Sequence, residues 1–160
     1  MKQIKIQNLY LEVITEILSS FMLDDVKSIS RRRFIRSIKE YVEDIKLSKK
    51  SIAEKYAKKD DKGEYIIVQN NYQFLPEILK IFTKKVGEVN NEYTTLDLTL
   101  SSEKDLSVVQ EIIKDEATKF IDANKNEFNA EGYDYVATLQ EMYTMLNPLG
   151  EQPESNEVAE

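Results

Sequence analysis

The chain of 160 residues contains no histidine, no cysteine and no tryptophan. The missing imidazole and thiol groups exclude the usual proton carrier at neutral pH, the thiolate nucleophile and the soft ligands of zinc sites. The four glycines, at positions 63, 87, 132 and 150, are too scattered to form a phosphate-binding loop, a dinucleotide fingerprint or a serine elbow. We therefore expect a protein that is not an enzyme, with no catalytic residue, no cofactor and no metal site.

Long apolar runs are missing as well. No segment approaches the ~18 consecutive apolar residues of a membrane span. The N-terminal segment MKQIKIQNLYLEV also lacks the apolar block and the small-residue cleavage site of a signal peptide. The sequence therefore predicts a cytoplasmic protein that makes no membrane contact.

The composition is that of a folded protein, with 41% hydrophobic and 32% charged residues. We expect one globular domain over residues 1–147. The remaining residues, 148–160, include the segment EQPESNEVAE, whose charges are all acidic. This tail is predicted to be disordered, since it holds too little apolar surface to pack.

Charge is distributed unevenly along the chain, which has a net charge of −7. Residues 1–59 contain 14 basic and 8 acidic residues, a net of +6, whereas residues 60–160 contain 8 basic and 21 acidic residues, a net of −13. If the two halves stay apart in space, one pole attracts acidic partners and the other repels nucleic acid.

Apolar spacing of three and four residues predicts helices over most of the chain, and alternation predicts a few short strands. We expect Asn8 to cap the first helix, and Ser28 or Ser30 to cap a second helix that reaches about Lys58 with an interruption near residues 47–48. The segment Asp60–Glu64 is predicted to be a turn, because it lacks the twelve-residue spacing of a calcium loop. The predicted elements are helices over 9–20, 28–58, 76–89, 102–120 and 132–146, and strands over 3–7, 64–74 (a hairpin) and 92–100.

These elements predict an α+β fold that is predominantly helical, with four to five helices and a small antiparallel sheet. We expect that sheet to combine the hairpin 64–74 with the strand 92–100. Pro76 is expected at the first position of its helix, where a missing N–H costs nothing. The sequence Ser102–Asp105 resembles a capping box for the helix that follows, and Asn129 or Gly132 is expected to precede the last helix.

A cluster of cations forms the first candidate site, as a contact for an anion or an acidic partner. Guanidinium groups bind phosphate well, and successive cations are typical of nucleic-acid contacts. Three consecutive helical residues point about 100° apart, however, so they cannot share one face, and we expect at least one to pair with a carboxylate. The acidic net charge also argues against nucleic acid. The cluster consists of Arg31, Arg32, Arg33, Arg36 and Lys39.

Aromatic side chains in the hairpin and the following strand form the second candidate site. Aromatic residues are favoured in protein interfaces, so these side chains could form an exposed contact surface. Burial in the core is the competing interpretation, and the sequence favours it. The candidate aromatic interface consists of Tyr65, Tyr72, Phe74 and Tyr93.

Several segments together resemble a family of small proteins from tailed phages and prophages of Gram-positive bacteria. The segments are IKIQNLYLEVITEIL, SRRRFIRSIKEYVEDI, IAEKYAKKDDKGEY with NYQF, and GYDYVATLQEMY, with the best matches at Ser30-x-Arg32-Arg33-Phe34 and Tyr56-Ala57-x-x-Asp60-x-x-Gly63. The family is a domain of unknown function, number sixteen-seventeen. The resemblance implies a phage-encoded protein made in the host bacterial cytoplasm, or associated with the virion, and it implies no activity.

These observations predict a non-enzymatic phage accessory protein that acts by binding proteins, either in virion assembly or as an inhibitor of a host factor. Its partner would be a phage structural protein, a host protein or a second copy of the chain. One alternative is a nucleic-acid-associated phage protein that uses the cluster Arg31–Lys39. Another is an enzyme that uses carboxylates and a divalent cation.

Overall fold

The computed structural model describes residues 2–124 and 129–147. The tail over residues 148–160, which the sequence predicts to be disordered, lies outside the described residues. The elements in chain order are β1 (Lys2–Gln7), α1 (Asn8–Ser20), α2 (Asp25–Tyr56), β2 (Ile67–Val68), β3 (Asn71–Tyr72), α3 (Pro76–Asn91), β4 (Tyr93–Leu98), α4 (Leu100–Ala123) and α5 (Ala130–Met145).

The structure confirms the α+β, predominantly helical fold class, but it corrects the predicted sheet. The strand β4 pairs with the N-terminal strand β1 in an antiparallel register that runs from Lys2 opposite Leu98 to Gln7 opposite Tyr93. The hairpin β2–β3 forms a second sheet of its own. The pairing of β1 with β4 follows from burial, because it places Ile4 directly opposite Leu96 and both side chains are buried.

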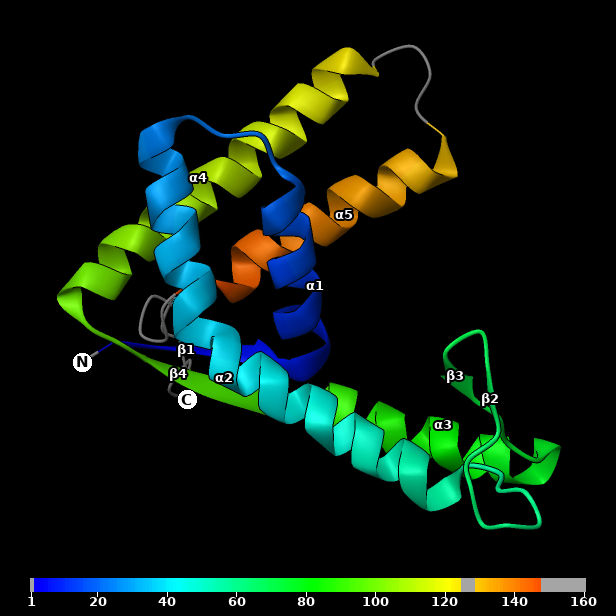
Figure 1. Ribbon diagram of the computed structural model, residues 1–160. Coiled ribbons are helices and arrows are strands. Elements are labelled where there is room, and N and C mark those ends of the chain that lie inside the picture. Colours follow the sequence, from blue (N-terminus) through cyan, green and yellow to red (C-terminus); the bar gives the residue numbers. More distant parts are fainter. Residues whose placement is uncertain (1, 125–128, 148–160) are drawn as a thin grey trace, which may run out of the picture.

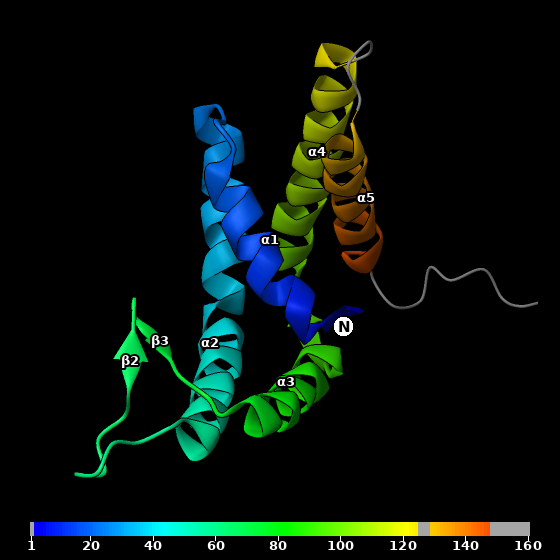
Figure 2. The same cartoon turned by 90° about the vertical axis from the view of Figure 1, so that its right-hand side faces the viewer.

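One apolar core joins the β1–β4 sheet to four of the helices. Figures 1 and 2 show α4 and α5 running antiparallel to each other, with α1 and α2 beside them and the sheet below their ends. The large side chains that are buried almost completely come from β1, α1, α2, α4, α5 and the residue that follows α5: Ile4, Ile6, Leu11, Ile14, Leu18, Ile38, Leu106, Ile112, Ile113, Leu139, Met142 and Leu146.

Asn8 connects elements and does not cap α1 as predicted. The residue before α1 is Gln7, and its side chain forms no capping hydrogen bond. The buried Asn8 amide instead donates to the Val89 carbonyl at 2.9 Å and accepts from the Thr94 hydroxyl at 2.7 Å. A buried amide needs such partners, and here they fix the ends of α3 and β4 against α1.

Three other predicted caps have different outcomes. Asp24 caps α2 by accepting from the backbone N–H of Lys27 at 2.9 Å, so the serines predicted for this role lie inside the helix. The capping box of α4 is formed by Thr99 and Ser102, three residues earlier than predicted. Asn129, one of the two residues expected before the last helix, caps α5 by accepting from the N–H of Gly132, and Gly132 lies inside the helix.

A single long helix carries the chain away from the core. Helix α2 continues without the predicted interruption near residues 47–48. Beyond it, the hairpin β2–β3 projects near the end of α2, and helix α3 runs back along the C-terminal half of α2 (Figure 1). The predicted turn Asp60–Gly63 lies between α2 and the hairpin, and Gly63 adopts a φ of 81° that favours glycine. We call residues 49–91 the arm.

Candidate functional site

Arg31, from the predicted cationic cluster, has a structural role. Its guanidinium Nη1 donates to the carbonyls of Leu18 at 2.9 Å and Phe21 at 2.6 Å. Helix α1 has no basic residue in its last turn, and its final carbonyls need donors from elsewhere. Arg31 supplies them from α2, so its charge is used at the end of α1 and does not face a ligand.

Two further cations of the cluster form ion pairs. Arg33 Nη1 lies 3.8 Å from a carboxylate oxygen of Asp105, a residue that is only 9% exposed. Lys39 lies 3.5 Å from Glu43, one helical turn along α2. The expectation that at least one arginine pairs with a carboxylate is therefore confirmed.

Arg32 and Arg36 are the remaining members of the cluster. Both side chains are exposed, and their spacing of four residues places them on the same face of α2. Within residues 2–124 and 129–147, neither forms an ion pair. The structure thus reduces the predicted five-residue cluster to a pair of free cations.

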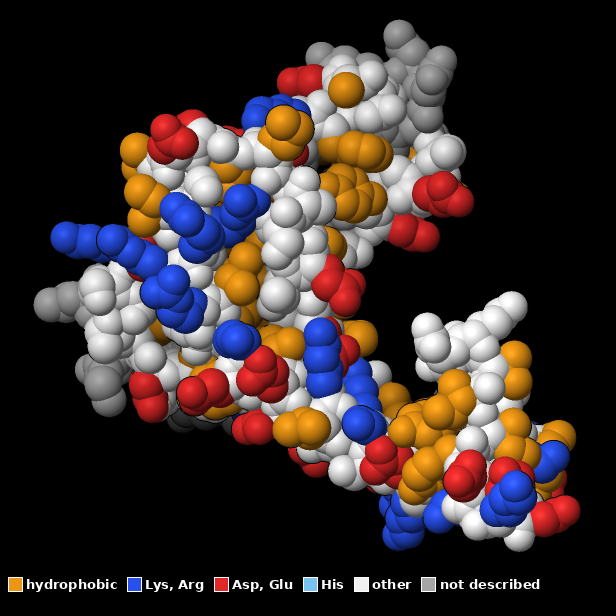
Figure 3. Space-filling view, viewed as in Figure 1, with side chains coloured by type: hydrophobic (Ala, Val, Ile, Leu, Met, Phe, Trp, Pro, Cys, Tyr) orange, Lys and Arg blue, Asp and Glu red, His pale blue; other side chains and the backbone are white. Residues whose placement is uncertain are grey.

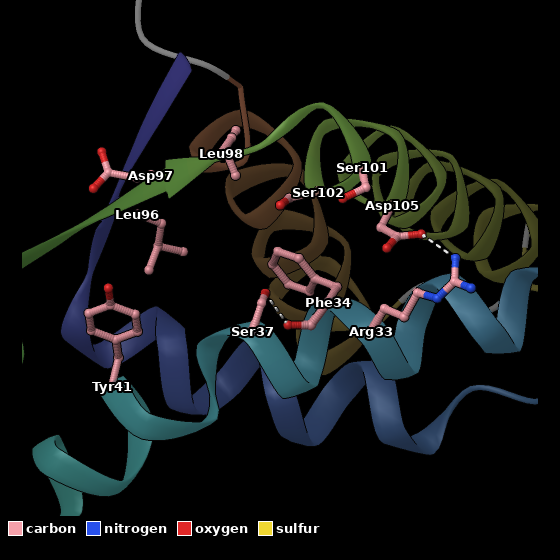
Figure 4. Close-up of a pocket in the computed structure, with 10 residues that line it drawn as sticks. All are labelled: Arg33, Phe34, Ser37, Tyr41, Leu96, Asp97, Leu98, Ser101, Ser102 and Asp105. Carbon is pink, nitrogen blue, oxygen red and sulfur yellow. Dashed lines mark hydrogen bonds and ion pairs between the residues drawn. The ribbon is translucent and has the colours of Figure 1, made fainter. Parts of the chain in front are cut away.

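A pocket of about 320 Å³ lies beside this cluster, between α2, β4 and the start of α4. Figure 4 shows Arg33 and Asp105 at one end of the pocket and Tyr41 at the other. Between these two ends, the pocket is lined by the apolar side chains of Phe34, Leu96 and Leu98.

The polar groups of the pocket are largely engaged with one another. The Ser37 hydroxyl donates to the Phe34 carbonyl at 2.7 Å, Ser102 belongs to the cap of α4, and Arg33 pairs with Asp105. The lining has one cation, Arg33, and two carboxylates, Asp97 and Asp105, and Asp97 accepts a hydrogen bond from Gln3. In the described residues, the hydrogen bonds of this pocket do not include a nucleophile held next to a base, the arrangement that covalent catalysis requires. In the described part of the chain, no three carboxylates come together in a group that could hold a metal ion.

Three of the four predicted interface aromatics lie on the arm. The rings of Tyr65 and Tyr72 meet edge to face with centroids 5.3 Å apart, and Phe74 stacks on Phe82 at 4.3 Å. Tyr93 lies in the other sheet, where the ammonium of Lys5 is 5.2 Å from the centre of its ring. The structure therefore brings Tyr65 and Tyr72 into contact, pairs Phe74 with Phe82 elsewhere on the arm, and places Tyr93 in the other sheet.

The hairpin and α3 also carry exposed aliphatic residues that the sequence analysis missed. Helix α3 has no fully buried residue, although it carries an apolar stripe that packs on α2. On the hairpin and α3, five aliphatic side chains are between 43% and 56% exposed: Ile67, Val68, Leu75, Leu79 and Ile81. Figure 3 shows hydrophobic side chains gathered on the arm. The only signal in the sequence was the excess of apolar residues in a short segment.

Scattered exposed aliphatic residues are normal on protein surfaces, whereas a contiguous group is typical of an interaction site. Lysines accompany this group, since residues 49–91 include nine lysines against six acidic residues, a net of +3. We call the exposed aliphatic residues of the hairpin and α3 the apolar face of the arm.

Comparison of the chain with known protein families, with curated proteins and with solved structures finds no match. None of the helices in the described residues combines the length and the apolar character that crossing a bilayer requires. The candidate sites therefore depend on the geometry alone.

Proposed function

We propose that this protein is non-enzymatic and acts by binding other protein molecules through the apolar face of the arm. The observation that supports this proposal is the group of five half-exposed aliphatic side chains on the hairpin and α3. Burial of apolar surface contributes roughly 25 cal/mol per Å², so covering such a group stabilises a complex substantially.

The arm also has the shape and charge of a docking element. It projects from the core on the long helix α2 (Figure 1), so a partner can reach it from several sides. The arm is also basic, with nine lysines against six acidic residues, so it attracts an acidic partner. The resemblance to the phage family favours a phage structural protein or a host protein as partner, in the host cytoplasm or in the virion.

The proposal is tested by affinity capture with the tagged full chain, followed by binding measurements with each captured protein after purification. The variants Ile67→Glu and Ile81→Glu place a charge on the apolar face, where both residues are exposed and folding is little affected. The matched control is Met22→Glu, because Met22 is 95% exposed and lies in the α1–α2 connection, outside the arm.

We expect the two arm variants to weaken binding at least tenfold, a loss of about 1.4 kcal/mol, and the control to bind like the parent chain. Circular dichroism shows whether each variant keeps its helical content. If a folded arm variant binds every captured protein, tagged copies of this chain included, as tightly as the parent, the arm is not the docking surface.

A further inference from the structure

We propose that the pocket between α2, β4 and the start of α4 binds a free α-amino acid with an apolar side chain. This pocket lies outside the arm, so its ligand is independent of the proposed function. Three features of the pocket support this ligand: a buried carboxylate without hydrogen-bond donors, a cation beside that carboxylate, and an apolar lining.

Asp105 is the buried carboxylate of the pocket. No described residue donates a hydrogen bond to its side chain. The nearest opposite charge, Nη1 of Arg33, lies 3.8 Å away, which exceeds the ~2.7–3.2 Å of a hydrogen bond. Buried polar groups are nearly always hydrogen-bonded, and a carboxylate can accept several such bonds. An ammonium group on a ligand would supply the missing donors.

Arg33 provides a cation at the same end of the pocket, and Figure 4 shows its guanidinium beside the carboxylate of Asp105. In the described part of the chain, this guanidinium donates no hydrogen bond, and the side chain is 65% exposed. Guanidinium groups bind carboxylates through two parallel hydrogen bonds. A ligand that contacts both residues therefore carries an ammonium and a carboxylate on neighbouring atoms, as an α-amino acid does.

The ligand does not need to break the ion pair between Arg33 and Asp105. Its ammonium would lie against Asp105 and its carboxylate against Arg33, so that opposite charges alternate around the four groups. Each charge of the ligand then has an opposite charge beside it, which compensates for the hydration that it loses in the pocket.

The middle of the pocket favours an apolar side chain on the ligand. Phe34 from α2 and Leu96 and Leu98 from β4 line this part, and the Ser37 hydroxyl already donates to the Phe34 carbonyl. The cavity of about 320 Å³ is at the small end of the range of about 300–1,000 Å³ that ligand pockets occupy. These properties suit leucine, isoleucine or phenylalanine.

The far end of the pocket does not favour a charged side chain on the ligand. Asp97 alternates with Leu96 and Leu98 along β4, so its side chain points to the other face of the sheet, where it accepts from Gln3 at 2.7 Å. Tyr41 brings a neutral hydroxyl to this end. A charged side chain would lose its hydration here without gaining an opposite charge.

The first test varies the ligand and uses the full parent chain. Isothermal titration calorimetry should show saturable binding of L-leucine, L-isoleucine or L-phenylalanine with a dissociation constant of about 1 mM or tighter. For the tightest of the three, two analogues should each bind at least tenfold more weakly: the amide, which lacks the carboxylate, and the deaminated acid, which lacks the ammonium. L-lysine and L-glutamate should also bind at least tenfold more weakly.

The second test varies the protein. Asp105→Asn keeps the size of the side chain and removes its charge, Arg33→Gln removes the guanidinium, and Ser37→Leu keeps both charges but fills part of the pocket. Each should raise the dissociation constant of the amino acid at least tenfold. Arg32→Gln is the matched control, because Arg32 is exposed next to Arg33 but does not line the pocket, and it should leave the dissociation constant unchanged.

Two further measurements separate a contact with the ligand from an effect on folding. Circular dichroism shows whether each variant keeps its helical content. Amide NMR spectra of the parent chain with and without the amino acid locate the site, and the shifted signals should come from residues 33–41, 96–98 and 101–105. If Asp105→Asn does not fold, the ligand series and Ser37→Leu decide the outcome.

Three results would overturn the inference. The first is that none of the three apolar amino acids binds with saturation up to roughly 10 mM. The second is that the amide or the deaminated acid binds as tightly as the amino acid, and the third is that the folded pocket variants bind like the parent chain. Ile67→Glu should not change the affinity for the amino acid, so failure of this inference leaves the proposed function of the arm unaffected.

Discussion

At the scale of single residues, Arg31 has a guanidinium group that could bind an anion, but that group stabilises the fold instead. Replacing Arg31 with Gln removes the two hydrogen bonds that its guanidinium donates to the end of α1. We expect the free energy of unfolding to fall by about 1–3 kcal/mol, since hydrogen bonds to charged groups contribute amounts of this size. Urea denaturation followed by circular dichroism measures the change.

The neighbouring Arg32→Gln is the matched control for this prediction. Arg32 is exposed on the same turn of α2, so its replacement should change the free energy of unfolding by less than about 0.5 kcal/mol. Equal losses in the two variants would mean that Arg31 does not stabilise the end of α1.

A second residue-scale prediction concerns the hydroxyl of Tyr10, which donates to the carboxylate of Glu141 and so connects α1 with α5. That hydrogen bond, together with burial and the negative charge of Glu141, raises the pKa of Tyr10 above its ordinary value of 10.0. A tyrosine with a raised pKa in the folded state contributes stability that is fully present below the unfolded pKa, near pH 10. The contribution is lost as the pH rises through the raised pKa.

The variant Glu141→Gln should therefore lower the pKa of Tyr10 towards its ordinary value and reduce the loss of stability at alkaline pH. Carbon NMR of labelled tyrosine follows the titration of Tyr10 directly. Glu40→Gln, which removes an exposed carboxylate from α2, is the control and should leave the titration unchanged. An identical Tyr10 pKa in the parent chain and in Glu141→Gln would contradict the assigned cause.

At the scale of secondary structure elements, the turn of the hairpin is the most strained point of the arm. Gln69 and Asn70 have φ angles of 50° and 63°, the left-handed values of a type I′ turn. Asn tolerates this backbone region, whereas for Gln the left-handed conformation costs roughly 1–2 kcal/mol of conformational free energy. Gln69→Gly should stabilise the hairpin by up to about 1 kcal/mol, after the extra freedom of glycine in the unfolded chain is subtracted.

Hydrogen exchange of the hairpin amides measures this local gain, because the hairpin can open without unfolding the core. Asn70→Gly serves as the comparison and should gain less. If Gln69→Gly speeds exchange of the hairpin amides, the turn is not strained in the way its φ angles indicate.

Local elements were predictable from the sequence, whereas their pairing was not. Periodicity located the helices within a few residues, and Pro76 begins α3 as predicted. The sheet was assigned wrongly because alternation shows that a strand is half-buried and not which strand it pairs with. Asn8 was assigned to a cap because local hydrogen bonding was the only role visible in the sequence. Its actual partners, Val89 and Thr94, lie more than 80 residues away.

The candidate sites show the same limit. The sequence indicated where arginines gather, but the pairing of Arg33 with Asp105 and the donation from Arg31 to α1 depend on how α2 packs. The apolar face of the arm exists because no other described element covers the side of α3 that faces away from α2. A stripe of apolar residues predicts that a helix packs against another element, but it does not show how much of the stripe remains exposed to solvent.

At the scale of the whole molecule, the basic and acidic halves of the sequence do not form two separate poles. The basic N-terminal half of α2 lies against the acidic helix α4. Three ion pairs cross between the two halves, Lys27 with Asp115 at 3.0 Å, Arg33 with Asp105 at 3.8 Å and Lys2 with Glu103 at 3.6 Å. These pairs compensate part of the charge of each half, and the arm keeps a net charge of +3.

This compensation leads to a prediction about nucleic acid. The cationic cluster offers Arg32 and Arg36, which can neutralise about two phosphates, and each phosphate contributes about −0.9 to the slope of log affinity against log salt. We expect the double variant Arg32→Gln with Arg36→Gln to make the slope for duplex DNA or RNA shallower by no more than about 2 in fluorescence anisotropy titrations over a series of salt concentrations. Lys114→Gln, an exposed change on α4, is the control and should change the slope less. Loss of a slope of about 5 in the double variant would mean that the cluster has a larger part in binding nucleic acid than its two free cations allow, and the nucleic-acid alternative would then be preferred to protein docking.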